Sequence, residues 1–325
     1  MNKVIINWEN YEEYSSYPIE YRFIDSAEII PGIEGWGSKL VSSQDWYFRV
    51  HFPGNPVMPG VLAMETLQQT GLLVITSLPG INEKTMILCN CKNMHMRNSI
   101  RPGDVLKTHV LLESFEREIA SFYGEVWIIR SNEESKLLAC SMKFSLIFQS
   151  KIRQQDTNFA PKPFELEEKS TMHFDCSNFD SFLADPPDYR FIDSVTVNSS
   201  SGIGRKCLSS LDWYFNLNKD SLMPVGFIME SLMQTGVLIV SQRKDITNPL
   251  MMFNDCTELE LFSGVRPDEE LITYVKMNSF RNGVAQYSGE ARVGNRIICK
   301  MKFTLIHPDE IKKFSERLKQ RSNTQ

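Results

Sequence analysis

The sequence predicts an α+β protein made of two similar domains, each an antiparallel β-sheet wrapped around one long central helix. Three observations lead to this prediction: the chain repeats itself, each copy contains a run that is apolar on every side, and strand-like segments follow that run. The chain has 325 residues, of which 42% are hydrophobic and 23% charged. This length is sufficient for two domains of about 150 residues each.

The internal repeat extends over most of the chain. Residues 21–26 and residues 189–194 both read YRFIDS. Four further pairs of similar segments follow in the same order: 35–48 with 202–215, 58–71 with 223–236, 100–104 with 265–269, and 140–147 with 299–306. Because ordered self-similarity is the signature of a repeated structural unit, we expect one domain at residues 1–150 and a second at residues 187–325. Residues 151–186 mix proline, charge and isolated aromatic residues without a steady period, which is typical of a linker.

The order of elements within each copy follows from its hydrophobic pattern. In the first copy we interpret DWYF, residues 45–48, as a strand. Residues 59–78 are almost wholly apolar, and a helix that is apolar all round is a buried helix. The runs VLKTHVLLESF, ASFYGEVWII and LLACSMKFSLIF come next, separated by short charged turns. Their alternation and β-rich composition predict successive antiparallel strands.

Composition and charge argue against several classes of protein. The formal net charge of −5 provides no excess of Lys and Arg to drive nucleic-acid binding. No window reaches 18 consecutive apolar residues, and the first 25 residues lack the apolar core of a secretion signal, so we expect no membrane span and a cytoplasmic location. The seven cysteines are scattered and never spaced as C-x-x-C. This predicts neither a disulfide framework nor a metal site.

Among the five histidines, His51 is the candidate for catalysis. It opens the segment HFPGNPVMPG, whose three prolines and two glycines hold the backbone in fixed turns just before the buried helix. The other four histidines lie in strand-like segments, in the linker or after the last strand, where a structural role is sufficient. A structural role for His51 is the alternative.

A carboxyl group within the apolar helix is the second candidate. Glu65 lies in the second turn, and Gln69 follows at i+4 on the same face. The second copy keeps this pair as Glu230 and Gln234. An apolar environment makes ionisation costly and should raise the pKa of the carboxyl, which leaves a protonated group able to act as a general acid near neutral pH. A carboxyl satisfied by a backbone or glutamine hydrogen bond is the structural alternative.

The two copies differ at the histidine. When the copies are aligned on the Trp of DWYF, His51 corresponds to Asn218, and the loop that follows is two residues shorter. Asparagine cannot carry a proton between groups, so the second copy has kept the acid and lost the base.

The segment from His51 to Glu65 resembles the signature of the FabA/FabZ-type β-hydroxyacyl-acyl-carrier-protein dehydratases, HFPG-x-PVMPG followed by a helical Asp or Glu. The similarity extends to the segments around YRFIDS and to the RPGD turn, and it covers nearly all of both halves. That family has the hotdog fold, in which an antiparallel sheet wraps a central helix. Two such units on one chain resemble the dehydratase regions of polyunsaturated fatty acid and polyketide synthases. The resemblance therefore implies a tandem, or double, hotdog.

The resemblance also implies where the site lies. In that family the histidine comes from one hotdog and the helical carboxylate from the other, so the working site would pair His51 with Glu230. The opposite site would contain Asn218 and Glu65 and would not catalyse dehydration. The acid-x-x-x-Gln pattern of double-hotdog dehydratases implies that Gln234 holds the carboxyl in place.

The implied reaction is elimination of water from a 3-hydroxyacyl thioester to give a trans-2-enoyl thioester. Neutral His51 would take a proton from Cα, and protonated Glu230 would give a proton to the departing hydroxyl. Backbone N–H groups around Gly60 and Val61, at a helix start that has Pro59 as its first residue, would bind the carbonyl oxygen. The chemistry implies no metal and no cofactor apart from the phosphopantetheine that carries the substrate.

The implied partner is an acyl carrier protein of fatty acid or polyketide biosynthesis. Its acidic surface would meet basic residues, for which Lys92, Arg97 and Arg101 are candidates. The two halves would form an intramolecular pseudo-dimer, which could pair further through its sheet edges. Three alternatives stay open: a hotdog thioesterase, an isomerase or dehydratase-isomerase acting on the same thioesters, and an inactive scaffold of a synthase complex.

Overall fold

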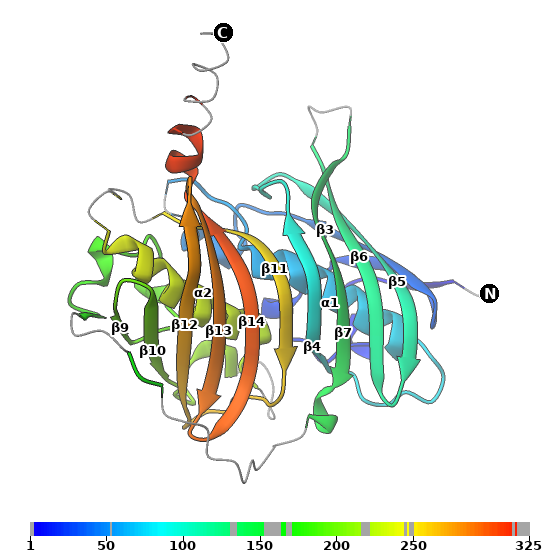
Figure 1. Ribbon diagram of the computed structural model, residues 1–325. Coiled ribbons are helices and arrows are strands. Elements are labelled where there is room, and N and C mark those ends of the chain that lie inside the picture. Colours follow the sequence, from blue (N-terminus) through cyan, green and yellow to red (C-terminus); the bar gives the residue numbers. More distant parts are fainter. Residues whose placement is uncertain are drawn as a thin grey trace.

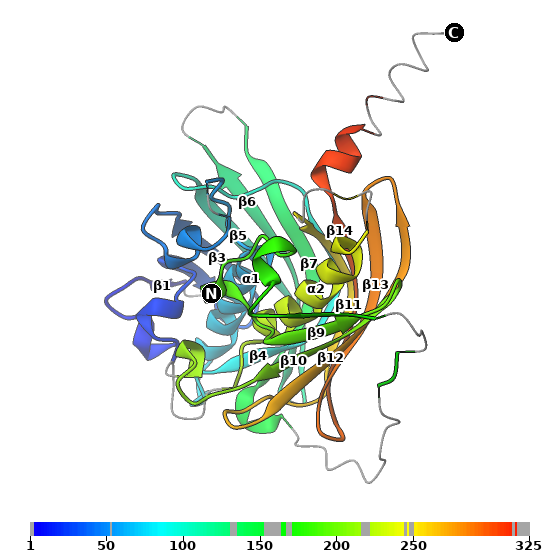
Figure 2. The ribbon, with the colours of Figure 1, turned by 90° about the vertical axis from the view of Figure 1, so that its left-hand side faces the viewer.

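The computed structural model describes residues 3–52, 54–130, 135–152, 164–166, 171–215, 222–243, 246, 250–313 and 316. Two helices of equal length, α1 (Gly60–Thr76) and α2 (Val225–Ser241), pack against a single β-sheet. In Figure 1 the long strands of both halves stand in front of the two helices, and Figure 2 shows the sheet curving around them.

The described residues form one 14-stranded sheet in which every neighbouring pair is antiparallel. The strands of the first half are β1 (Val4–Ile6), β2 (Ser26–Ile30), β3 (Glu34–Leu40), β4 (Met86–Met96), β5 (Val105–Glu116), β6 (Ile119–Ile129) and β7 (Leu137–Phe148). Those of the second half are β8 (Met172–Asp175), β9 (Ser194–Val197), β10 (Ser201–Cys207), β11 (Met252–Leu261), β12 (Glu270–Arg281), β13 (Val284–Val293) and β14 (Arg296–Ile306). Short 3-10 helices connect them: η1 (Tyr11–Glu13), η2 (Ile19–Tyr21), η3 (Trp46–Arg49), η4 (Gln149–Lys151), η5 (Phe179–Ser181), η6 (Pro187–Tyr189) and η7 (Trp213–Phe215).

The strand order shows the two-fold arrangement of the halves. It runs β1-β2-β3-β5-β6-β7-β4 and continues as β11-β14-β13-β12-β10-β9-β8, so the second half repeats the first in reverse. The halves join where β4 pairs with β11, with Cys91 opposite Leu259 and Met94 opposite Cys256. This arrangement confirms the predicted α+β double hotdog, in which each half wraps one helix.

The helices are buried because their sequences are apolar on every side. All residues from Val61 to Thr76 are buried in α1, and the whole of α2 is buried. The strands that cover them alternate in burial, as β6 does along most of its length, so that one face of the sheet packs on the helices. Each large apolar side chain removed from water in this way contributes about 1.5–3 kcal/mol.

Three local expectations were wrong. Residues 46–49 form the 3-10 helix η3 instead of a strand, because the tight turns around them bring Trp46 and Tyr47 onto the core. Pro59 is the N-cap of α1, and the helix begins at Gly60. The apolar run 59–78 was expected to be helical throughout, but the helix ends at Thr76, where the N–H of Ser77 bonds back to the carbonyl of Leu73.

Part of the predicted linker, residues 151–186, belongs to the second half. β8 pairs with β9 and extends the sheet back to Met172. Phe174 and Phe179 are buried in the core, so these two aromatic residues of the segment are packing residues. Phe164 stacks on Tyr274 of β12 with ring centroids 4.9 Å apart, on the outside of the second half.

Candidate active site

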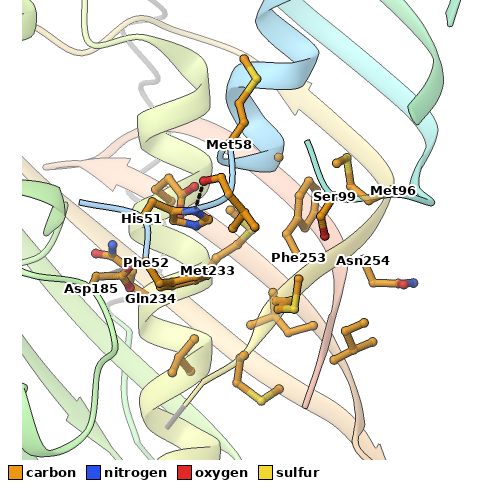
Figure 3. A pocket seen from close by; sticks show the side chains of 18 of the residues that line it. His51, Phe52, Met58, Met96, Ser99, Asp185, Met233, Gln234, Phe253 and Asn254 are labelled. Carbon is orange, nitrogen blue, oxygen red and sulfur yellow. Dashed lines mark hydrogen bonds between the residues drawn. The ribbon is translucent and has the colours of Figure 1, made fainter. Parts of the chain in front are cut away.

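A cavity of about 220 Å³ lies where the two halves meet (Figure 3). The first half contributes the loop before α1 and the residues that follow β4. The second half contributes one face of α2, the start of β11 and the end of β14. His51 from the first half and Glu230 from the second both line this cavity, as the sequence predicted.

The loop that carries His51 is held by its own backbone. The N–H of His51 donates to the carbonyl of Tyr47, and the N–H of Val57 donates to the carbonyl of His51, each at 2.9 Å. Between them a tight turn closes through a hydrogen bond from the N–H of Asn55 to the carbonyl of Phe52. Gly54 in this turn has φ of +78°, a conformation that glycine adopts without strain.

The ring of His51 is fixed in one neutral form. Its Nδ1 lies 3.0 Å from the carbonyl oxygen of Val57. Because a carbonyl oxygen only accepts, Nδ1 carries the proton and Nε2 keeps a lone pair. Burial lowers the pKa of His51 from its ordinary 6.5 to about 4. His51 is therefore an uncharged proton acceptor at neutral pH.

Glu230, in contrast to His51, is a proton donor. It lies in the second turn of α2 and is 8% exposed. Its pKa is raised from 4.5 to about 8, mainly by burial and in addition by the charge of Asp185, while a hydrogen bond from Tyr189 acts to lower it. At neutral pH Glu230 is therefore protonated and able to donate.

Tyr189 connects these two residues and was missed by the sequence analysis. Its hydroxyl donates to Glu230 Oε1 at 3.1 Å, and its ring meets the ring of His51 edge-on with centroids 5.5 Å apart. The signal was present, because Tyr189 opens the repeated segment YRFIDS. The matching Tyr21 bonds to Glu65 in the same way in the first half.

Gln234 lines the cavity but does not bond to Glu230, so its expected role was wrong. Its Nε2 donates to the carbonyl of Tyr189 at 2.7 Å, and its Oε1 accepts the N–H of Phe191 at 2.9 Å. The side-chain amide of Gln234 bonds to these two backbone groups instead of to Glu230, because they would otherwise be buried without partners. Gln234 thus holds the backbone that places Tyr189, and Tyr189 holds Glu230.

The start of α1 reaches the cavity through Gly60. The first backbone bonds here join the N–H groups of Leu62 and Ala63 to the carbonyl of Pro59, which leaves the N–H groups of Gly60 and Val61 without intrahelical acceptors. A Cβ on Gly60 would lie 2.8 Å from the ring of Phe253, so a larger residue would narrow the cavity. The side chain of Val61 lies outside the lining and packs toward Gly226 of α2.

The second pocket of the pseudo-dimer is smaller. It has a volume of about 50 Å³ and is lined by Tyr17, Tyr21, Glu65 and Val225, among others. Burial raises the pKa of Glu65 from 4.5 to about 7. Asn218, the predicted partner of Glu65, lies outside the described residues.

Two further properties of the described part of the chain bear on function. No group of three or more His, Cys, Asp or Glu side chains there is placed to hold a metal ion. No helix in this part of the chain is both long and apolar enough to cross a membrane. Of the three basic residues expected to meet a carrier protein, Arg97 lines the cavity, whereas Lys92 pairs opposite Glu258 in the sheet and Arg101 follows β4 outside the lining.

The fold and the site define a class: double-hotdog proteins with a histidine and a carboxyl group in a cavity between the two hotdogs. A family model described as a FabA-like domain matches residues 33–130.

Three relatives named 3-hydroxyacyl-[acyl-carrier-protein] dehydratase FabZ are similar in sequence. The one from Chloroflexus aggregans is 44% identical over 92 residues, 28% of this chain and 64% of the relative, so the chain spans just under two thirds of it. The relative from Lactobacillus helveticus is 42% identical over 40% of this chain and 84% of its own, and that from Alkaliphilus metalliredigens is 33% identical over 42% and 93%.

The chain therefore belongs to the FabZ-type dehydratase family. Solved structures extend the similarity of fold to both halves. The dehydratase domain of RzxB from Pseudomonas fluorescens has a TM-score of 0.58 at 10% identity and covers 84% of this chain and 94% of its own. The dehydratase domain from the CurJ module of curacin polyketide synthase has a TM-score of 0.55 at 13% identity, with 87% and 95% covered.

Proposed function

We propose that this protein dehydrates 3-hydroxyacyl thioesters carried on an acyl carrier protein to trans-2-enoyl thioesters, in fatty acid or polyketide biosynthesis. The observation that carries the proposal is the pairing in one cavity of a neutral His51 with a protonated Glu230 from the other half. The names of the FabZ relatives support the substrate class. One active site per chain follows, because His51 has its acid partner only in this cavity.

The reaction divides between the two residues. Nε2 of His51 takes a proton from Cα of the substrate, which the thioester carbonyl makes acidic. The electron pair of that C–H bond forms the new double bond as the C–O bond breaks. Glu230 gives its proton to the departing hydroxyl, which leaves as water. His51 ends protonated and Glu230 ionised, and transfer of one proton back through solvent restores both.

The start of α1 supports the carbonyl oxygen of the substrate. Negative charge develops on this oxygen as the Cα proton leaves, and free backbone N–H groups at a helix N-terminus stabilise such charge. The N–H of Gly60 is the donor that we place at the cavity, with the N–H of Val61 next to it. Because the elimination transfers no electrons to another molecule, we propose that it uses no cofactor besides the phosphopantetheine that carries the substrate.

The second pocket is proposed to be inactive. Its Glu65 has no histidine in the matching position of the repeat, and Tyr17 occupies part of the space where a substrate would lie. Val225 stands where Gly60 opens the first cavity, which reduces access further. The cytoplasmic location and the state of assembly beyond the pseudo-dimer stay predictions from the sequence.

The test follows a short 3-hydroxyacyl pantetheine thioester and its 2-enoyl product by mass spectrometry. His51→Ala and Glu230→Gln should each lower the rate by about 10²-fold or more, the scale of general acid–base catalysis. Glu65→Gln is the matched control, because it makes the same change in the second pocket, and it should retain the wild-type rate. Circular dichroism and thermal unfolding would establish that each variant is folded.

The same assay separates the alternatives. Release of free acid without any 2-enoyl product would favour a thioesterase. A 3-enoyl product formed from the 2-enoyl thioester would indicate an isomerase activity of the same pair. No reaction of wild type, even with carrier-bound substrates, would contradict the proposal and favour a scaffold.

A further inference from the structure

Asp185 is a second carboxyl group in the active cavity. It lines the same cavity as His51 and Glu230, and Figure 3 shows it among the lining side chains. It lies directly before Pro186, the N-cap of η6, which is the short helix that ends at Tyr189. Its backbone carbonyl accepts a hydrogen bond from Nε of Arg190 at 3.0 Å, which holds the turn closed.

The repeat shows that this carboxyl is present on one side only. Asp185 precedes Pro186 as Tyr17 precedes Pro18, so the two residues occupy matching positions. Tyr17 lines the second pocket, and its hydroxyl donates to the carbonyl of Met86 at 3.0 Å. The cavity that contains His51 thus has two carboxyl groups, and the second pocket has an aromatic ring in place of one of them.

The charged groups around Asp185 do not cancel the effect of its negative charge on Glu230. Burial raises the pKa of Asp185 to about 7, and Arg190 partly opposes this. Arg190 itself is engaged on its other side with exposed Asp180. The other titratable or charged groups at the cavity are His51, uncharged at neutral pH, Arg97, which also lines it, and the hydroxyl of Tyr189.

We propose that Asp185 is a positioning residue whose negative charge keeps the proton on Glu230. The inference rests on the proposed function, in which Glu230 must donate that proton. Two carboxyl groups that line one cavity do not both ionise readily, and the first to ionise disfavours ionisation of the second. Asp185 ionises first because Arg190 stabilises its charge, and Glu230 then remains protonated to a higher pH.

Replacement of the charge tests this role. Asp185→Asn keeps the shape of the side chain and should move the alkaline limb of the kcat/KM profile to lower pH by about one unit, since one pKa unit is a typical effect of a neighbouring charge. Activity at pH 9 should then be about tenfold below wild type, whereas at pH 6, where Asp185 is protonated, the two should agree. Asp185→Glu should restore the alkaline limb. Asp180→Asn is the matched control, because it removes an acid that also contacts Arg190 but lies outside the cavity.

A second readout does not require turnover. In protein labelled with ¹³C at the glutamate side-chain carboxyl, the resonance lost in Glu230→Gln identifies Glu230, and its titration gives an apparent pKa. This pKa should fall in Asp185→Asn and stay unchanged in Asp180→Asn, with thermal unfolding as the check on folding. An unchanged Glu230 titration in Asp185→Asn would overturn the inference even if dehydration is confirmed. A shifted titration in a protein without dehydratase activity would support the coupling and overturn the proposed function instead.

Discussion

At the scale of single residues, the protonation states of His51 and Glu230 predict the pH range of activity. His51 accepts a proton only when neutral, which requires a pH above its pKa of about 4. Glu230 donates only when protonated, which requires a pH below its pKa of about 8. The rate should therefore be highest between these values, fall as the pH drops through 4 and fall as it rises through 8. A profile of kcat/KM against pH measures both limbs, and a rate that keeps rising above pH 9 would contradict the assignment of Glu230 as acid.

Tyr189 predicts a shift of the alkaline limb in the direction opposite to that of Asp185. The hydrogen bond from its hydroxyl stabilises the ionised form of Glu230 and so lowers the pKa of that carboxyl. Tyr189→Phe should move the alkaline limb to higher pH and lower kcat by about tenfold, because Glu230 becomes a weaker acid and loses its orientation.

Tyr21→Phe is the matched control for Tyr189→Phe, since Tyr21 holds Glu65 in the second pocket. It should leave both kcat and the pH profile as in wild type. If both tyrosine variants lose activity equally, the second pocket takes part in catalysis and the one-site proposal fails.

The sequence could predict the site residues whose type and spacing form a recognisable motif. It could not predict those that join the site only because the fold brings distant segments together. His51 and Glu230 lie in recognisable segments, so both could be named in advance. The repeat marks Tyr189 as a residue present in both halves, but its contact with Glu230 spans 41 residues of chain, and nothing local indicates that contact. Asp185 lies just outside the repeated segment, and its matching residue is Tyr17, so comparison of the two copies gives no signal for it.

At the scale of elements, α2 holds the active segment through Gln234. Gln234→Leu would leave the N–H of Phe191 and the carbonyl of Tyr189 buried without partners, at a cost of about 1–3 kcal/mol each. The free energy of unfolding should fall by about 2–6 kcal/mol, measured by denaturant titration. Activity should fall as well, because Tyr189 would lose its fixed place.

Gln69→Leu provides the comparison, since Gln69 makes the matching bonds to the carbonyl of Tyr21 and the N–H of Phe23. Gln69 has two further and longer bonds, to the carboxyl of Glu65 and from the hydroxyl of Tyr11, each at 3.3 Å. It should cost a similar free energy of unfolding while kcat stays near wild type. Loss of stability in only one of the two variants would show that Gln69 and Gln234 do not stabilise the two halves in the same way.

The elements that the sequence predicted well are those fixed by their own pattern. The central helices are apolar on every side, and the long strands alternate, so burial alone determines them. Residues 45–48 were wrongly expected as a strand, because their aromatic residues suit a strand, and only the turns on either side indicate the 3-10 helix η3 that forms there. β8 has four residues, which is too short for alternation to be detected, and it is defined by its pairing with β9.

At the scale of the whole molecule, the site exists because the two halves share one sheet and one core. β4 and β11 join the sheets, and aromatic rings join the cores: Trp46 meets Trp213 with centroids 4.8 Å apart, and Tyr21 meets Phe227 at 6.2 Å. His51 and Glu230 belong to different halves, and contacts between the halves such as these bring them to one cavity. Catalysis should therefore require both halves to be folded and joined.

This continuity predicts that the protein unfolds in a single cooperative transition. Phe144 in β7 and Phe303 in β14 occupy matching positions in the repeat, and each is 2% exposed. Replacing either with alanine should cost about 3–5 kcal/mol. If the halves are one cooperative unit, both variants should shift one calorimetric peak to lower temperature, and activity should be lost across the same transition.

Independent halves would behave differently under the same substitutions. Phe144→Ala would then split off a low-temperature peak for the first half and leave the second half melting as in wild type, and Phe303→Ala would do the reverse. In that case the pairing of β4 with β11 would be too weak to couple the unfolding of the two halves, and the halves would separate at the cavity before either core unfolds. A single peak in both variants, with equal calorimetric and van't Hoff enthalpies, would instead mean that a core substitution in either half lowers the stability of the shared site.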